Sequence, residues 1–267
     1  RLSLGVAVNF WRSSPFGENS WEQRIDAENL SFTADGTVLL GLTDTKEQYE
    51  DFSGENIVLG LLWNPTDAWS VGLRYDSAFS GNVSYTKKGY GLSLIPTSGF
   101  LQATPYWTRE KREVRFPDTL AVGVARRFSD RFTLSMDVPR TEWDDFYVKG
   151  ASKNRFSLIN GGNLDALCFA PSFEPTYTVR MGAEYVMIPE NPGVELDRLW
   201  SVRGGLFYDQ EPAGNEPDNF WGLAFGLGLL ANNRVNIDLA YQVRYGHDVK
   251  PDFVRGTKGF KEDVFQH

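Results

Sequence analysis

Segments of about ten residues, in which apolar side chains alternate with small or polar ones, recur along the whole chain. Residues 220–246 read FWGLAFGLGLLANNRVNIDLAYQVRYG, so a row of large apolar residues alternates first with Gly and Ala and then mostly with polar residues. Side chains of a β-strand point alternately to its two faces, so both halves predict a strand. The residues 231–233 between them predict a tight turn. This period of two constrains the fold more than any other feature.

The alternation predicts nine strands in one continuous antiparallel meander. They lie at residues 2–11, 57–64, 69–76, 120–127, 132–139, 177–185, 200–209, 221–229 and 235–245. Tight turns are expected at 64–67, 129–130 and 231–233, and long polar loops at 13–53, 85–113 and 148–174. Residues 247–267 are also interpreted as a loop. No linker or repeat divides the chain, so residues 1–267 are expected to form a single domain.

Two architectures fit such a meander: a soluble sheet with its apolar face in a core, and a membrane barrel with that face in lipid. Strands of about ten residues match the apolar band of a membrane barrel, whereas soluble strands more often have five or six. Glycine is frequent on the opposite face, and every lysine falls outside the nine strands. Aromatic residues gather where the apolar rows end, as in an interfacial belt. The sequence therefore predicts an all-β, up-and-down transmembrane β-barrel.

Charge and composition exclude several functions. The formal net charge of −8 leaves no basic stripe that could neutralise nucleic-acid phosphates, so no nucleic-acid partner is expected. One cysteine allows no internal disulfide. Two histidines, without a nucleophile–base arrangement around them, predict neither an enzyme nor a metal site, and no cofactor is expected. Arg, Asp and Glu on the small-residue face are expected to pair across strands and fix the register.

Residues 116–146, FPDTLAVGVARRFSDRFTLSMDVPRTEWDDF, resemble the outer-membrane transporters of long-chain fatty acids and aromatic hydrocarbons, the FadL/TodX-like family. VRMGAEY at 179–185, VRGGLFYDQEP at 202–212 and LAFGLGLLANNRVNIDLAYQ at 223–242 follow in the order that this family shows. The resemblance implies a fourteen-stranded barrel, with an N-terminal plug in its lumen and a kinked strand through which hydrophobic ligand leaves sideways. About nine strands are visible here, so the sequence is interpreted as a portion of such a barrel, with the plug and the closing C-terminal strand missing.

Two expected loop segments are too apolar to face water alone. They are residues 89–107 and 156–173, and their large apolar residues either pack together as a lid or leave a groove that captures ligand. The expected ligand-binding residues are Leu94, Ile95, Phe100, Leu101, Tyr106, Trp107, Phe156, Leu158, Phe169 and Phe173, with Phe207 continuing an apolar path inside the barrel. Basic residues nearby could attract a carboxylate headgroup or could be a solvated charge run: Lys87, Lys88, Arg109, Lys111, Arg112 and Arg115.

These observations together predict passive transport of hydrophobic compounds, long-chain fatty acids or similar, across the outer membrane of a Gram-negative bacterium. The expected partners are a hydrophobic small molecule and the outer-membrane lipids, and the protein is expected to be a monomer. Two alternatives remain: a general diffusion porin for polar solutes, and a soluble β-sandwich that binds a ligand.

Overall fold

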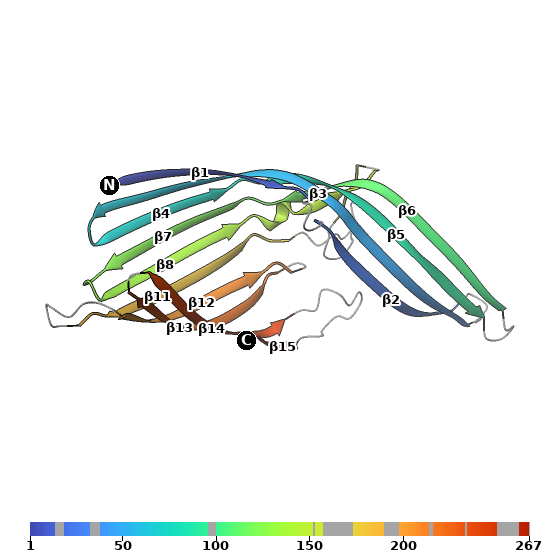
Figure 1. Ribbon diagram of the computed structural model, residues 1–267. Helices are drawn as coiled ribbons and strands as arrows, with labels where there is room; N and C mark the ends of the chain where they lie inside the picture. Colours follow the sequence, from blue (N-terminus) through green and yellow to red (C-terminus); the bar gives the residue numbers. More distant parts are fainter. Residues whose placement is uncertain are drawn as a thin grey trace.

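The fold was examined in a computed structural model that describes residues 1–13, 19–32, 38–95, 100–151, 153–156, 173–189, 198–213, 216–232, 234–249 and 262–266. All fifteen strands belong to one antiparallel sheet, which curls round from β1 through β8 to β14 (Figure 1). In the described ranges no helix has the length and apolar content needed to cross a membrane. Within the same ranges no pairing joins β1 to β15, so the sheet is open rather than a closed barrel.

Nine strands form the wall of this open barrel and confirm the nine that the alternation predicts. They are β1 (Leu2–Trp11), the second half of β3 (Val38–Thr66), β4 (Trp69–Asp76), β7 (Thr119–Arg127), β8 (Phe132–Thr141), β11 (Thr176–Met187), β12 (Arg198–Glu211), β13 (Asp218–Ala231) and β14 (Val235–Val249). Each pairs with its neighbour in the order β1-β3-β4-β7-β8-β11-β12-β13-β14. The turn between β13 and β14 contains Asn232 at a φ of 51°, a left-handed conformation that asparagine tolerates well.

The expected long loops at 13–53 and 85–113 are wrong, because most of each is β-strand. β2 (Trp21–Phe32), the first half of β3, β5 (Phe79–Ile95) and β6 (Phe100–Phe116) form a four-stranded extension that runs on beyond the wall (Figure 1). Two short strands, β9 (Tyr147–Lys149) and β10 (Arg155–Phe156), lie at the start of the third expected loop, where β9 pairs with β6 and β10 pairs with β9. Charged residues, such as the opposed Glu47 and Lys87, interrupt the apolar rows of these strands, so the sequence shows no clear alternation there.

The extension meets the wall at one level, where several strands are interrupted. β3 has a bulge between Glu50 and Ser53, and Asp51 within it has a φ of 57°. β4 gives way to β5 across residues 77–78, and β6 gives way to β7 across residues 117–118. Short turns lie at the opposite end of the wall, which is the periplasmic end in barrels of this type. The extension is therefore on the extracellular side.

The expectation that residues 247–267 are a loop is also wrong in part. β14 continues to Val249, and Glu262–Gln266 forms β15, which pairs with β14 through Arg244↔Gln266 and Tyr245↔Phe265. The polar residues between these strands conceal the return of the chain to the sheet.

The two faces of the wall differ as the sequence predicts. The apolar rows are exposed along their whole length, with Leu239 at 67% and Trp221 at 66% exposure. An apolar surface of this extent has no counterpart on soluble monomers and is the face that contacts lipid. The opposite face carries the glycine, alanine and charged rows, so it lines the lumen. The soluble sandwich, with its apolar face in a core, is thereby excluded.

Candidate functional site

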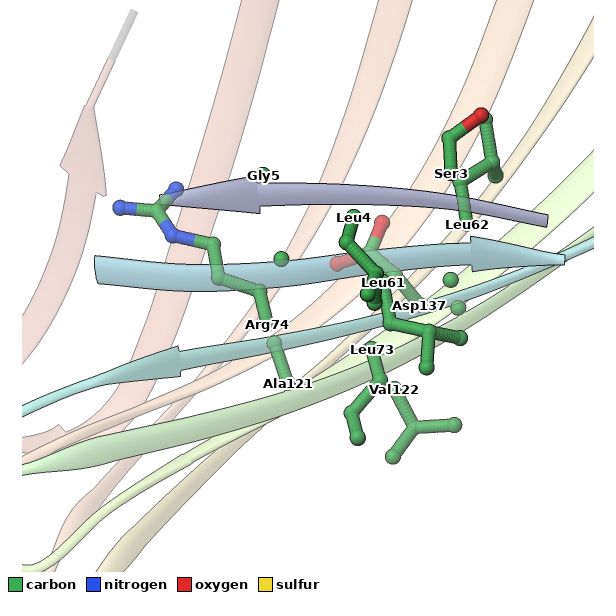
Figure 2. Close-up of a pocket in the computed structure, with 13 residues that line it drawn as sticks. Ser3, Leu4, Gly5, Leu61, Leu62, Leu73, Arg74, Ala121, Val122 and Asp137 are labelled. Carbon is green, nitrogen blue, oxygen red and sulfur yellow. The ribbon is translucent and has the colours of Figure 1, made fainter. Parts of the chain in front are cut away.

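A continuous row of residues crosses the inner face of the wall from β1 to β14. Cross-strand register places in this row Ser3, Leu62, Gly72, Gly123, Asp137, Arg180, Phe207, Gly222 and Arg244. Small residues at its start leave a hollow of about 470 Å³ in the wall, lined among others by Gly5, Gly60, Gly72 and Gly123. Figure 2 shows Leu73 and Val122 on one side of the sheet there and Ser3 and Leu62 on the other. The small residues therefore widen the lumen at this level.

Ion pairs across strands confirm that the inner-face charges neutralise one another. Arg203 on β12 lies between Glu184 on β11, at 2.7 Å, and Asp238 on β14. Arg180 on β11 pairs with Asp137 on β8 at 3.6 Å. Because the partners come from different strands, these pairs fix the register of the wall. Arg203 has two acids beside one cation, so this part of the lumen is net negative.

Aromatic rings lie over glycines on the inner face of the last strands. The ring of Phe207 occupies the space beside Gly222, where a Cβ atom would lie 1.9 Å from its Cζ atom. Phe220 covers Gly246 in the same way and is 1% exposed. The guanidinium of Arg244 stacks on the Phe220 ring at 3.7 Å. Pairing an aromatic residue with a cross-strand glycine compensates for the weak strand propensity of glycine and keeps an apolar surface on the lumen.

A network of nine aromatic rings, here called the aromatic column, extends this apolar surface into the extension. Its members are Trp11, Trp21, Tyr49, Phe52, Phe79, Tyr85, Phe116, Trp143 and Phe146. Phe116 is the junction, with ring centroids 4.9 Å from Phe79, 5.6 Å from Phe52 and 5.6 Å from Phe146. Such spacings are those of favourable aromatic pairs.

Register places the column on the lumen side. Gly54 shares the inner row of β3 with Gly60, and a Cβ atom on Gly54 would contact the Phe79 ring. Sequence reasoning missed the column because it assigned Tyr49 and Tyr85 to loops. The segment 116–146, which carries the family resemblance, ends in Trp143-x-x-Phe146, and a 3-10 turn there (η1, Trp143–Asp145) brings Phe146 to Phe116.

Charges at the base of the extension are paired as well. Arg112 lies 3.3 Å from the centre of the Tyr85 ring and 2.6 Å from the carboxylate of Glu110. Burial, followed by the negative charge of Glu47, raises the pKa of Tyr49 to about 12 and raises the pKa of Tyr85 further. Both phenols therefore stay neutral at physiological pH and pack in the buried core of the extension.

Two of the predicted ligand-binding residues that the structure describes lie on opposite faces of the extension. Tyr106 and Trp107 are neighbours on a strand, so their side chains point to opposite faces. Tyr106 covers Gly89 on the inner face, with its hydroxyl against Thr45, whereas Trp107 is 66% exposed on the outer face. The error arose because a hairpin strand was interpreted as a loop, in which consecutive residues could face one ligand.

The remaining predicted residues are separated along the extension. Phe156 on β10 lies opposite Val148 on β9, and Val148 in turn lies opposite Val114 on β6. Val114 is eight residues from Tyr106, or ~26 Å along the strand at the usual rise. Phe173 is buried, and Phe207 lies on the lumen face as predicted. Leu158 and Phe169 lie outside the described residues, as do the side chains of Leu94, Ile95, Phe100 and Leu101.

The wall of nine long strands, lipid-facing outside and glycine- and charge-lined inside, leads to the comparison with known proteins. The sequence profile described as outer membrane protein transport protein (OMPP1/FadL/TodX) matches residues 1–257. The chain belongs to this family. It is an outer-membrane β-barrel protein of a family that transports hydrophobic compounds, which confirms the predicted membrane, fold and general function.

Solved structures agree in fold. The CymD monoaromatic hydrocarbon channel is 15% identical, with 92% of this chain and 75% of that chain covered and a TM-score of 0.50. The toluene transporter TodX of Pseudomonas putida is 14% identical over 92% and 72% of the two chains, with a TM-score of 0.47. A FadL homologue of Pseudomonas aeruginosa is 12% identical over 92% and 82%, with a TM-score of 0.42. At these identities the similarity to CymD supports only the fold, and the similarities to the other two structures are too weak to support a conclusion. No curated protein sequence matches the chain significantly.

Proposed function

We propose that the protein is a passive, monomeric channel for neutral hydrophobic solutes, with monoaromatic hydrocarbons as the preferred class. The observation that carries this proposal is the aromatic column, which follows the lumen side of the extension down to the level where it meets the wall. Tyr49, Phe52 and Tyr85 are buried and support the column, whereas Phe79, Phe116 and Phe146 are only partly buried. Flat aromatic solutes gain favourable ring contacts with these partly buried rings in addition to the burial of their own apolar area. The CymD channel, which shares the fold, is itself a monoaromatic hydrocarbon channel.

Inner-face charges favour a neutral solute over a fatty acid. A free carboxylate needs an uncommitted cation, but Lys87 is paired with Glu47 and Arg112 with Glu110. Further down, Arg244 has two acids beside it, Asp209 and Glu211, just as Arg203 has. A net negative wall repels a carboxylate in the low dielectric of a protein lumen. Long-chain fatty acids, which the family resemblance suggests as solutes, therefore serve as the comparison ligand in the binding test.

The test measures binding and flux in the full protein. Purified protein in detergent is titrated with toluene and with a C18 fatty acid, and the same protein in a planar bilayer is tested for ion current. We expect toluene to bind more tightly than the fatty acid and the ion current to be small. Tighter binding of the fatty acid overturns the choice of solute. A large, steady current overturns the hydrophobic channel in favour of a porin.

A matched pair of variants tests the aromatic column. Phe116→Leu removes the central ring of the column but retains an apolar side chain, and Phe225→Leu makes the same change on the lipid face, where the side chain is 61% exposed. The loss of ring contacts worth about 0.5–1.5 kcal/mol predicts roughly 2- to 12-fold weaker toluene binding in Phe116→Leu. Toluene binding is expected to be unchanged in Phe225→Leu. Equal affinity in the two variants contradicts a role of the column in binding.

A further inference from the structure

The basic residues of the extension separate onto two faces of the β5–β6 hairpin. Lys87 and Arg112 are on the inner face, where each pairs with an acid. The outer face takes the alternate positions of β6, including Arg109, Lys111 and Arg115, which lie opposite Thr86, Ser84 and Ser80 of β5. Lys88 lies on the same face, opposite Trp107. The basic residues that are close together in the sequence are therefore divided between two faces with different surroundings.

The outer surface, here called the basic face, has an excess of cations. Two more come from β9 and β10, where Lys149 lies opposite Glu113 and Arg155 lies opposite Lys149. Both stack on the Tyr147 ring, at 5.2 and 5.6 Å. Glu113 is the one acid on the outward positions of these paired strands, and it pairs with Lys149 at 3.8 Å. Apart from Arg155, which has a further interaction of its own, five cations thus stand against one carboxylate in a protein whose net charge is −8.

Among the described residues, four cations of the basic face form no ion pair, although the Glu22 carboxylate is close enough to Lys88 for their charges to interact. Across the described part of the chain, no ion pair involves Lys88, Arg109, Lys111 or Arg115. The neighbouring strands behave differently on the same outer surface, since Lys46 pairs with Glu22 at 2.6 Å and Arg24 with Asp44 at 2.8 Å. Lys88, Arg109 and Lys111 are exposed. Uncompensated charge at this density repels itself unless an anion binds there.

The height of the basic face matches the headgroups of the outer leaflet. The outward row of the wall ends at Tyr75 and Leu120, which are opposed across β4 and β7. Arg115 precedes Leu120 by five residues, ~17 Å along the strand and ~12 Å in height at a tilt of about 45°. Long Arg and Lys side chains extend their charged ends toward an interface, so the lower cations reach the headgroup layer. The surface they meet there is the phosphorylated glycolipid of an outer membrane.

We propose that the basic face binds the phosphate groups of the outer-leaflet glycolipid. Arg109 and Arg115 supply planar donors that suit bidentate contacts with phosphate, and Lys88 and Lys111 supply point charges between them. The exposed Trp107 at the upper end of the face presents a ring to the sugars of the same lipid. Binding holds the β5–β6 hairpin against the membrane surface and leaves the aromatic column on the lumen side open to solute.

The experiment compares lipid binding in two triple variants of the full protein. In one, Arg109, Lys111 and Arg115 are changed to Gln, and in the other Arg126, Arg127 and Arg234, exposed cations at the tight-turn end, are changed to Gln. Both lose the same charge, and both are first tested for the strand-rich circular dichroism of the folded barrel. Purified lipopolysaccharide and its dephosphorylated form are then titrated in detergent, and bound lipid is counted by native mass spectrometry.

Three cations near an anionic surface predict a loss of affinity on the order of a hundredfold for lipopolysaccharide in the first variant. The second variant is expected to bind like the unchanged protein, and the dephosphorylated lipid to bind weakly to all three. Equal losses in the two variants would show an effect of net charge and overturn the site. Unchanged binding in the first variant overturns it too. Effective competition by inorganic phosphate alone would show a site for the free anion rather than for the lipid.

Discussion

A single arginine placed at three positions on β14 tests which face of the wall meets lipid. Val235 and Tyr245 delimit the outward row of this strand, ten residues or ~34 Å apart along the chain. At a tilt of about 45° this distance corresponds to a height of ~24 Å, close to the ~25 Å apolar band of membrane barrels. Leu239 lies four residues from Val235, so its depth is ~10 Å and it is near the middle of the bilayer.

We expect Leu239→Arg to lower the free energy of unfolding by about 2–4 kcal/mol, the cost of an arginine at the bilayer midplane. This cost corresponds to a roughly 30- to 900-fold change in the folding equilibrium. Val235→Arg at the interface should cost only about 0–1 kcal/mol. Gln242→Arg, on the same strand but facing the lumen, should have little effect because the side chain there is exposed on the polar face rather than to lipid.

The assay is urea titration of the protein folded into vesicles, with the free energy extrapolated linearly to water. The order of the three costs decides the outcome, because a residue in a soluble core would tolerate arginine at neither Leu239 nor Val235. A Gln242→Arg cost as large as that of Leu239→Arg would refute the assignment of the two faces. Equal costs at Leu239 and Val235 would refute the depth argument.

Three further predictions concern the inner face and the extension. Gly222→Ala should destabilise the barrel by about 1–3 kcal/mol, because the new Cβ overlaps the Phe207 ring, and adding Phe207→Ala should remove most of that cost in the same urea titration. Arg203→Gln should cost about 1 kcal/mol by leaving two acids unpaired, and Glu184→Gln in that background should recover part of it. Ultraviolet titration should show Tyr49 ionising near pH 12 rather than 10. Since its folded pKa is raised, the stabilisation from its burial is complete below pH 10 and is lost as the pH rises through 12, and an ordinary phenol midpoint would contradict this burial.

Much of the wall could be predicted from the sequence, because the alternation of apolar with small or polar residues is visible within each membrane strand. The rows of residues 221–229 and 235–245 already separate a lipid face from a lumen face, without knowledge of any neighbour. The inner-face charges also predicted that Arg and acidic residues would pair. Which partners meet could not be predicted, because Arg203, Glu184 and Asp238 come from three strands whose relative register is a property of the assembled sheet.

The candidate site was harder to predict than the wall. Phe207 was found because it lies in a strongly alternating strand. Tyr106 and Trp107 were assigned to one groove, whereas the hairpin sends them to opposite faces. The inner face of the extension mixes aromatic with charged residues, so the hydrophobic periodicity of residues 13–53 and 85–113 was too weak to predict strands there.

The sequence by itself determined that this chain forms an outer-membrane barrel wall, because the solvent on each side of a strand must match the side chains that face it. Only the tertiary structure decided the aromatic column and the basic face. Both are built from side chains that come together through pairing of distant strands, such as Tyr49 with Tyr85 and Lys88 with Trp107. Pairing over such distances depends on the register of the whole sheet, which no local pattern encodes.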